Sequence, residues 1–364
     1  MSRKIYIVGA HSRAQTLAVY LQYLYPDIKV EAYLYDNEEQ NPEKIGTVPV
    51  PFLNEHTKLN TRYPIYIGTR GIYHSRFENK LREMGCEEIY PVTVELDLIL
   101  RNKYMKKYFS SIGREFLKIE MLKESTVSNQ KKEDNLEKMI YVARSAFDKP
   151  LRQKYKLAFY EKTIQVGAEL TSVCLHPGVL TDNVGENISV KNRQYCELTA
   201  MYWIWKHAPE DIVGLVHYRR HFILPENWAQ IMQDYEVDVI LPTPLYVLPN
   251  IAENYKKRHD SSDWEFMMHY LKKQDLYTYQ EAESFFAGNL YSPCNMFIMK
   301  KKVLDEFCEW LFPILDAVTE HGGQKENGYQ NRYPGFLSER LLTFFFEKNR
   351  DVYKVIYADK NFLE

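Results

Sequence analysis

The segment from Asp182 to Phe222, DNVGENISVKNRQYCELTAMYWIWKHAPEDIVGLVHYRRHF, reads as a polar loop, a helix and a short apolar strand in that order. The strand ends at four residues, His217, Tyr218, Arg219 and Arg220. In open α/β sheets, ligands bind beyond the carboxyl ends of the strands. Paired arginines suit a pyrophosphate there, because a guanidinium stays charged and can bind two phosphate oxygens at once. The segment therefore predicts an α/β unit with a nucleotide-sugar site.

The polar loop at the start of this segment offers hydrogen-bonding side chains for a ribose, a base or a sugar. They belong to Asp182, Asn183, Glu186, Asn187, Lys191 and Asn192. A turn-rich surface loop could look similar, but it would rarely stand directly before an aromatic helix and a double arginine. We therefore expect Asp182, Asn183, Asn187, Lys191 and Asn192 to bind the donor together with His217, Tyr218, Arg219 and Arg220.

Apolar side chains spaced for one helix face follow the loop. Leu198, Met201, Tyr202 and Trp205 stand at i, i+3, i+4 and i+7, which predicts a helix over residues 193–207 with Asn192 at its N-cap. Glu197 points away from this apolar face. It could be solvated, but we favour a carboxylate that faces the cleft, where it would contact the acceptor.

Strands and helices alternate in both halves of the chain, which predicts an α/β fold, with a small parallel sheet in the first half. In the first half, strands are expected at 4–8, 30–35, 63–67 and 88–91, with helices at 14–25 and 75–84. In the second half, strands are expected at 139–144, 212–216, 237–241, 294–299 and 352–357, with helices at 193–207, 264–273, 302–318 and 338–348. The stretch 118–138 is charged and poor in apolar residues, as a linker would be. We therefore expect a small Rossmann-like domain over 1–117, a linker over 118–138 and a second α/β domain over 139–364.

The first turn of the N-terminal half, Gly9-Ala10-His11-Ser12-Arg13-Ala14, follows the G-x-G-x-x-G/A pattern except that His11 replaces the middle glycine. That glycine lets the backbone approach a pyrophosphate. Its replacement disfavours dinucleotide binding, although Asp36 stands about where a ribose-binding acid would. A structural or docking role is favoured for this domain, and an NAD-dependent oxidoreductase is a weaker reading of the chain.

Composition narrows the class of protein further. The 364 residues, 45% hydrophobic and 26% charged, suit a globular protein of two domains. A net charge of −2 gives no attraction to nucleic acid or to an anionic membrane. No apolar run approaches the roughly 18 residues of a membrane span, and no signal-peptide segment follows Met1. The five cysteines lack C-x-x-C spacing, which indicates reduced thiols in a cytoplasmic protein.

Four segments carry a family resemblance: DNVGENISVKNRQYCELTAMYWIWK, VGLVHYRR, NMFIMKK and GYQNRYPGFLSERLL. In this order they resemble a glycosyltransferase family of bacterial capsular-polysaccharide and O-antigen loci, some members of which are galactofuranosyltransferases with a GT-A-like fold. The resemblance covers roughly Met139 to the C-terminus. It implies a transferase that moves a hexosyl unit, with galactofuranose as one candidate, from a UDP-sugar to a lipid-linked polysaccharide acceptor.

The same resemblance implies work at the cytoplasmic membrane face, in peripheral contact with the membrane or with other polysaccharide-assembly enzymes. No nucleic-acid partner is expected. A competing class is a non-catalytic sugar- or nucleotide-binding scaffold of a polysaccharide-assembly complex.

The leaving diphosphate must be neutralised as the glycosidic bond breaks. GT-A enzymes usually do this with a divalent metal held by Asp-x-Asp just after an apolar strand. The nearest match here, Glu236-Val237-Asp238, precedes its apolar run. Arg219 and Arg220 stand after a strand and can supply the positive charge instead. We therefore expect neither a divalent metal nor another cofactor.

An inverting transferase also needs a carboxylate that takes the proton of the acceptor hydroxyl. Glu339 is the preferred candidate, because the resemblance implies a base at such a loop-to-helix junction. A glutamate in a first turn could instead only complement the helix dipole. Asp260 is the rival candidate. Acceptor contacts are expected from Glu197, His259, Asn295, Met296, Tyr329 and Arg332, although Asn295 could instead bond the backbone within the sheet.

Overall fold

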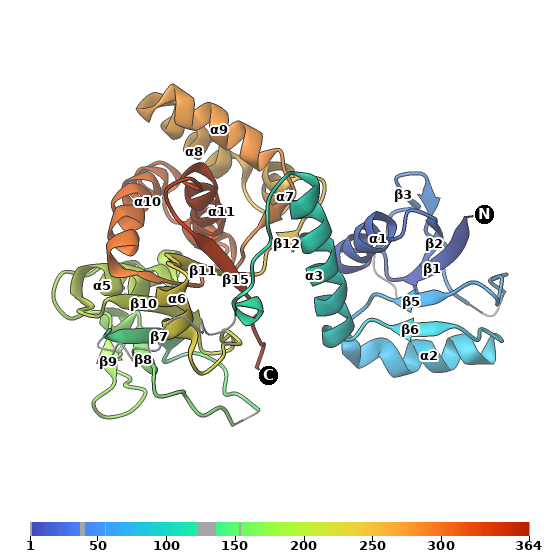
Figure 1. The fold of residues 1–364 in the computed structure, drawn as a ribbon, viewed down its shortest axis with the longest axis horizontal. Helices are drawn as coiled ribbons and strands as arrows, with labels where there is room; N and C mark the ends of the chain where they lie inside the picture. Colours follow the sequence, from blue (N-terminus) through green and yellow to red (C-terminus); the bar gives the residue numbers. More distant parts are fainter. Residues whose placement is uncertain (1, 37–40, 55, 123–135, 153, 364) are drawn as a thin grey trace. The chain divides into compact units, whose positions relative to one another are not determined.

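The computed structural model describes residues 2–36, 41–54, 56–122, 136–152 and 154–363 (Figure 1). The chain divides into two compact units, Met1–Phe116 and Leu117–Glu364, and each unit has its own sheet. Strands alternate with helices in both units, so the α/β class predicted from the sequence is confirmed. No helix among these residues has both the length and the apolar character required to cross a bilayer.

The first unit contains a parallel sheet of four strands in the order β2-β1-β5-β6. Its strands are β1 (Arg3–Val8), β2 (Ile28–Leu34), β5 (Ile65–Ile67) and β6 (Ile89–Pro91), beside a small hairpin of β3 (Lys44–Ile45) and β4 (Val48–Pro49). Its helices are α1 (Ser12–Leu24), α2 (His74–Glu83) and α3 (Val94–Ser111). From β1 the chain crosses to β2 toward one side of the sheet, and from β5 it crosses to β6 toward the other side. Because both crossovers are right-handed, α1 and α2 lie on opposite faces of the sheet (Figure 1).

The second unit contains a mixed sheet of seven strands in the order β15-β11-β14-β10-β7-β8-β9. These strands are β7 (Lys138–Ser145), β8 (Glu161–Val166), β9 (Leu180–Thr181), β10 (Ile212–His217), β11 (Val239–Pro242), β14 (Phe297–Lys300) and β15 (Val355–Ala358). β14 runs antiparallel to β10 and β11, whereas the other pairs are parallel. The amino end of β14 therefore lies at the same sheet edge as the carboxyl ends of its neighbours.

Helices cover both faces of this sheet. They are α4 (Asn192–Tyr195), α5 (Leu198–His207), α6 (Trp228–Asp234), α7 (Ile251–Lys256), α8 (Ser261–Gln274), α9 (Leu276–Phe286), α10 (Lys301–Gly322) and α11 (Tyr333–Lys348). A short pair of strands, β12 (Leu245–Tyr246) and β13 (Leu290–Tyr291), stands apart from the large sheet. Side chains alternate along β10, which buries Val213 and Leu215 in the core of α5, α10 and α11, and Ile212 and Val216 in the core of α6. Burial on both faces explains the unbroken apolar run of this strand.

Two helices differ from their predicted bounds. The helix expected over 193–207 is interrupted, because Cys196 has a left-handed φ of 50° between α4 and α5. The helix expected over 338–348 starts earlier, at Tyr333, with Pro334 in its first turn, where a missing N–H costs nothing. Glu339 therefore lies in the second turn of α11, and the expected first-turn position is wrong.

The first residues of the predicted linker belong to the second unit. Lys118 is buried, forms a parallel bridge with Tyr357 of β15, and its ammonium lies 2.6 Å from Asp359 Oδ2. The amide of Tyr357 donates to the carbonyl of Leu117 at 2.9 Å. Residues 123–135 of the predicted linker lie outside the described residues.

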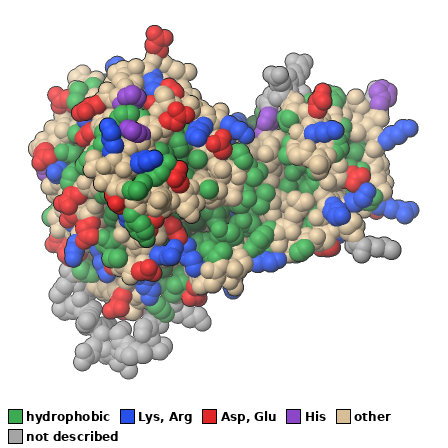
Figure 2. All heavy atoms as spheres, turned by 90° about the horizontal axis from the view of Figure 1, so that it is seen from above, with side chains coloured by type: hydrophobic (Ala, Val, Ile, Leu, Met, Phe, Trp, Pro, Cys, Tyr) green, Lys and Arg blue, Asp and Glu red, His purple; other side chains and the backbone are tan. Residues whose placement is uncertain are grey.

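Charge is mixed on the face of the larger unit drawn in Figure 2. Acidic and basic side chains stand side by side over that face rather than in separate fields. This agrees with the formal net charge of −2. A binding site for an anion in this unit therefore depends on particular arginines rather than on an overall positive potential.

Candidate functional site

Candidate functional side chains of the second unit gather at the side of the large sheet where its parallel strands end, which is called the edge below. The carboxyl ends of β7 and β10 are paired there, with His217 opposite Ala143. Leu215 of β10 pairs with Phe297 of β14, so residues 294–296 enter the same edge from the antiparallel strand. The start of α5 and the second turn of α11 add Glu197 and Glu339.

His217, at the end of β10, is held by a backbone carbonyl. Its Nε2 lies 2.5 Å from the carbonyl oxygen of Cys294 and 3.9 Å from Glu197 Oε1. A carbonyl only accepts, so Nε2 carries the proton in this contact. Burial lowers the pKa of His217, Glu197 raises it, and Arg220 lowers it further. At neutral pH the side chain is therefore a neutral, fixed donor.

Glu339 bonds the amide of Cys294, the residue whose carbonyl holds His217. Its Oε1 accepts a hydrogen bond of 2.9 Å from the amide of Cys294, and its Oε2 lies 3.3 Å from Arg340 Nη1. The side chain is 19% exposed. Burial raises its pKa, while the charges of Arg340 and Arg220 lower it. Glu339 is thus a carboxylate with increased basicity that keeps some contact with solvent.

Glu197 and Asn295 link α5 to α11 beneath this pair. Asn295 Nδ2 donates to Glu197 Oε1 at 2.8 Å and to the Gly335 carbonyl at 3.0 Å. The Oδ1 atom of Asn295 is buried and has no hydrogen-bond partner among the described residues. Glu197 is itself buried against Asn295, which is fully buried, so the acceptor contacts expected of both residues stay predictions.

Strained backbone is concentrated at this edge. Cys196, Cys294 and Asn295 have φ values of 50°, 79° and 48°. Such left-handed conformations are costly for residues with a side chain, and they persist where the surroundings enforce them. The strain at Cys294 directs its N–H to Glu339 and its carbonyl to His217, and the strain at Cys196 ends α4 just before Glu197.

Arginines supply positive charge at the edge. Arg219 lies over the Tyr218 ring, with its guanidinium carbon 5.1 Å from the ring centroid. Its Nε, like that of Arg144, is buried without a hydrogen-bond partner among the described residues. Arg220 lies 5.4 Å from the centroid of Phe362, and Arg332 Nε donates to Cys196 Sγ at 2.9 Å. Because the Nε–H of Arg219 lacks a hydrogen-bond acceptor among the described residues, an anionic ligand would suit this guanidinium.

In the polar loop before α4, two of the side chains that were expected to bind the sugar donor form hydrogen bonds within the protein instead. Asp182 is fully buried and accepts hydrogen bonds from four groups, the amides of Gly167 and Ala168 and the hydroxyls of Ser189 and Thr199. Asn192 donates to Thr199 Oγ1 at 3.0 Å and to the Cys196 carbonyl at 2.7 Å. Both side chains support the loop from within, so the direct donor contact expected of Asp182 is not available.

The remaining loop side chains also have partners in the protein. Lys191 Nζ lies 2.8 Å from Asp316 Oδ1 on α10. Asn183 Nδ2 donates to Glu169 Oε2 at 3.2 Å, and Asn187 Nδ2 donates to the Gly185 carbonyl at 2.8 Å. These contacts are at least partly exposed, so a ligand could still reach Lys191 and Asn183.

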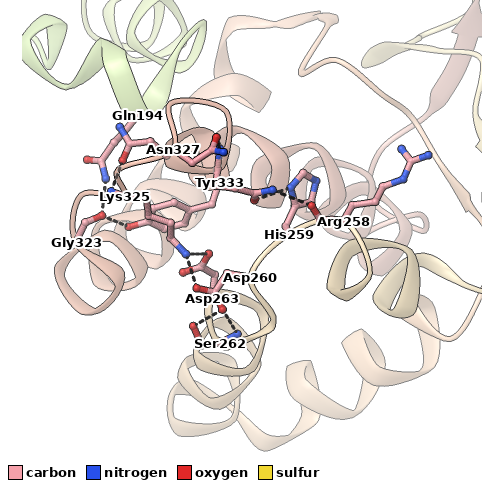
Figure 3. A network of polar contacts seen from close by, with 12 residues as sticks. Gln194, Arg258, His259, Asp260, Ser262, Asp263, Gly323, Lys325, Asn327 and Tyr333 are labelled. Carbon is pink, nitrogen blue, oxygen red and sulfur yellow. Dashed lines mark hydrogen bonds and ion pairs between the residues drawn. The ribbon is translucent and has the colours of Figure 1, made fainter. Parts of the chain in front are cut away.

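Asp260, the rival base, belongs to a different network (Figure 3). It caps α8 by accepting from the amide of Ser262 at 3.0 Å, and its Oδ2 lies 2.9 Å from Lys325 Nζ. Asp263, almost fully buried, binds the same ammonium. The hydrogen bond from Lys325 lowers the pKa of Asp260 to about 2. The carboxylate of Asp260 is therefore engaged as the N-cap of α8 and as a partner of Lys325.

The other expected acceptor residues lie in different surroundings. His259 stacks on Phe336 with centroids 4.2 Å apart, and burial lowers its pKa to about 4. Tyr329, 55% exposed, packs on the same Phe336 ring at 5.1 Å. Met296 is fully buried in the core beside α6, so its expected place at the border of an acceptor is wrong.

Several residues of the edge were missed by the sequence analysis. Asp148 follows β7, and burial raises its pKa while Arg144 and Arg219 lower it. The rule that sites form beyond strand ends would have found it, because β7 itself was predicted. Cys196 and Cys294 act through backbone strain, which the sequence does not signal.

The segment Glu236-Val237-Asp238 precedes β11 and lies at the end of that strand opposite to the edge. Its Asp238 pairs with Lys300 at 2.7 Å.

No group of three or more His, Cys, Asp or Glu side chains in a metal-binding arrangement occurs in the described parts of the chain. All five cysteines, which lie within those parts, are free thiols.

Comparisons with known proteins place the fold of this chain. A solved structure described as "WbbM bifunctional glycosytransferase apo structure" superimposes with a TM-score of 0.54 and 26% sequence identity. The similarity covers 63% of this chain and 45% of that chain, so this chain corresponds to less than half of the bifunctional protein. No curated protein sequence matches this chain.

A family model described as "Domain of unknown function (DUF4422)" matches residues 138–350. The match begins at the first residue of β7, ends just after α11, and includes His217, Arg219, Arg220 and Glu339. It thus covers more than half of the chain and nearly all of the second unit. The chain belongs to the DUF4422 family, and 63% of it superimposes on the structure of a glycosyltransferase.

Proposed function

We propose that this protein is a glycosyltransferase that moves a hexosyl unit from a UDP-sugar to a polysaccharide acceptor. The observation that carries the proposal is a partly buried carboxylate, Glu339, within the electrostatic influence of Arg220 at the edge where the parallel strands end. The glycosyltransferase that shares the fold supports the same reaction class. A carboxylate and a phosphate-binding cation are the two groups that the transfer needs.

The reaction follows from the roles of these groups. The acceptor oxygen attacks the anomeric carbon of the donor, its proton passes to Glu339, and the bond from that carbon to the diphosphate oxygen breaks. The electron pair of that bond leaves with UDP, whose charge Arg219 and Arg220 neutralise. Attack from the side opposite to the diphosphate inverts the configuration of the sugar. His217 stays neutral and keeps the Cys294 backbone in place behind Glu339.

Glu339 is a better base than Asp260 on physical grounds. Burial raises the pKa of Glu339, which brings its basicity closer to neutral pH. Lys325 lowers the pKa of Asp260 to about 2, which makes it a weak base. Asp260 is also committed to capping α8.

The finer specificity rests on the family resemblance of the four sequence segments. It favours galactofuranose as a candidate sugar and a capsule- or O-antigen-type acceptor on a lipid carrier, with peripheral contact to the cytoplasmic membrane face. Because arginines can neutralise the diphosphate, the transfer is proposed to need no divalent metal.

The direct test is to measure UDP release from a panel of UDP-hexoses with an oligosaccharide acceptor, alongside calorimetric UDP binding. Turnover of one donor, with a product of inverted anomeric configuration by NMR, is the expected result. UDP binding without turnover of any donor would contradict a catalytic role and favour a sugar- or nucleotide-binding scaffold.

A further inference from the structure

A pocket in the first unit lies where that sheet reverses its strand order. It has a volume of about 660 Å³, and its wall includes the turn after β1, the first turn of α1, and the residues that follow β5. Strand order β2-β1-β5-β6 reverses between β1 and β5, and open α/β sheets bind ligands at such a point. The volume lies within the usual range of small-molecule sites.

The backbone of the pocket is shaped for close approach. Gly9 has a φ of 112°, which side chains rarely allow, and it turns the chain from β1 into α1. At Gly68 a Cβ atom would come within 3.2 Å of the Cα of Ala14, so the glycine lets the end of β5 pack directly on α1. This contact supplies the close helix-to-strand packing of a nucleotide-binding turn although His11 replaces the middle glycine.

The polar lining favours an anion. Arg13, Arg70 and Arg76 line the pocket, and Asp36 is the one carboxylate among the described residues of the lining. Asp36, 7% exposed, lies 2.6 Å from Arg76 and 3.5 Å from Lys80, so its charge is already compensated.

A second feature of the lining calls for a ligand group. Thr69 Oγ1 lines the pocket region as a buried hydroxyl without a hydrogen-bond partner among the described residues. A buried hydroxyl of this kind is costly until something bonds to it. His11, at the N-cap of α1, makes no side-chain capping bond, so a phosphate could accept from the amides of the first turn, where the helix dipole is positive.

Aromatic rings complete the wall. Tyr35, Tyr73 and Phe77 line the pocket, and the guanidinium carbon of Arg76 lies 4.9 Å from the centroid of Phe77. Flat apolar rings beside a cation suit a nucleobase, which has a π-face of its own. His11 stands at the sequence position of the glycine that lets the backbone approach the pyrophosphate of a dinucleotide, which favours a ligand without that bridge.

We propose that this pocket binds a nucleotide with a single nucleoside, with its phosphate at the start of α1 and its base against the aromatic wall. The site belongs to the first unit, and the proposal does not depend on the function proposed for the second. It gives the first unit a ligand-binding role in place of a purely structural one.

The test uses the full chain with R219A and R220A, two changes that together should weaken nucleotide binding at the proposed edge site of the second unit far below that of the pocket. Calorimetry with UMP, UDP and AMP should still detect one site per chain. Ser12, exposed in the first turn of α1, is then changed to Asp. A negative charge there favours the helix but repels a phosphate, so S12D should weaken the remaining binding at least tenfold, and R70A should weaken it as well.

The matched control is S75D, the same change at an exposed position in the first turn of α2 outside the pocket lining. It should leave nucleotide binding unchanged. The proposal would be overturned by no nucleotide binding in the R219A/R220A chain, by equal effects of S12D and S75D, or by inorganic phosphate binding as tightly as the nucleotides. NAD⁺ binding tenfold tighter than AMP would show a dinucleotide site and also contradict it.

Discussion

The surroundings of Glu339 set the pH dependence that a transfer reaction should have. The base must be deprotonated, and burial raises the pKa of this carboxyl group above that of an ordinary glutamate. Activity should therefore fall as pH decreases through this raised pKa. A kcat profile that stays level down to the ordinary glutamate range would contradict the assignment, and it would agree with a base of pKa about 2 such as Asp260.

Asp260 gives the matched comparison at the residue scale. Asn is itself a good N-cap, so D260N should keep the start of α8 and lose only the half-exposed ion pair with Lys325. The expected cost is at most about 1 kcal/mol of unfolding free energy, with kcat within a few-fold of wild type. Because the pKa of Asp260 is lowered to about 2, this contribution is present at neutral pH and lost as pH falls through that value. Urea unfolding and steady-state kinetics check both points, and an inactive but folded D260N would move the base to Asp260.

Arg219 is expected to contribute measurably to the binding of the UDP part of the donor. Replacement by alanine should weaken UDP binding by roughly 1.5–3 kcal/mol, as for a hydrogen bond to a charged group. Since the arginines supply the charge, activity should also persist in a chelator. Calorimetry and an assay with EDTA test the two statements, and loss of activity in EDTA with rescue by manganese would show that a metal is required.

At the element scale, Asp182 joins the turn after β8 to the loop before α4 and to α5. Its carboxylate accepts from two amides and two hydroxyls in a fully buried site. In D182N an amide NH₂ would oppose some of these donors, so the unfolding free energy should fall by about 2–4 kcal/mol. Thermal unfolding measures this loss. A D182N protein of unchanged stability with only a raised donor KM would show a direct donor contact instead.

Much of the element order could be predicted from apolar patterns, and what failed has physical causes. The buried strands β1, β7 and β10 are strong apolar runs and were found. Helix α3 was missed although Thr93 caps it and Glu95 stands in its first turn, both of which are start signals in the sequence. The break at Cys196 has no such signal, because no Gly or Pro marks it.

At the scale of the whole molecule, the candidate site depends on chain topology more than on any motif. β14 is inserted antiparallel between β10 and β11, which brings Cys294 and Asn295 beside His217 from about 80 residues away along the chain. Strand direction and order are decided by packing over the whole sheet, so the sequence offered Glu339 and the arginines as candidates but did not reveal the Cys294 backbone that bonds both Glu339 and His217. The first unit shows the same limit, since the pocket depends on Gly68 beside Ala14.

The central claim is that Glu339 takes the acceptor proton at a site that binds UDP independently of it. The most direct measurement is single-turnover UDP release by wild type and E339Q at saturating donor, with UDP affinity measured on the same preparations. Gln keeps the shape of the side chain and removes the base, so the rate should fall by roughly 10²–10⁴ while UDP affinity stays within a few-fold. An E339Q protein that binds UDP normally and transfers at the wild-type rate would contradict the account.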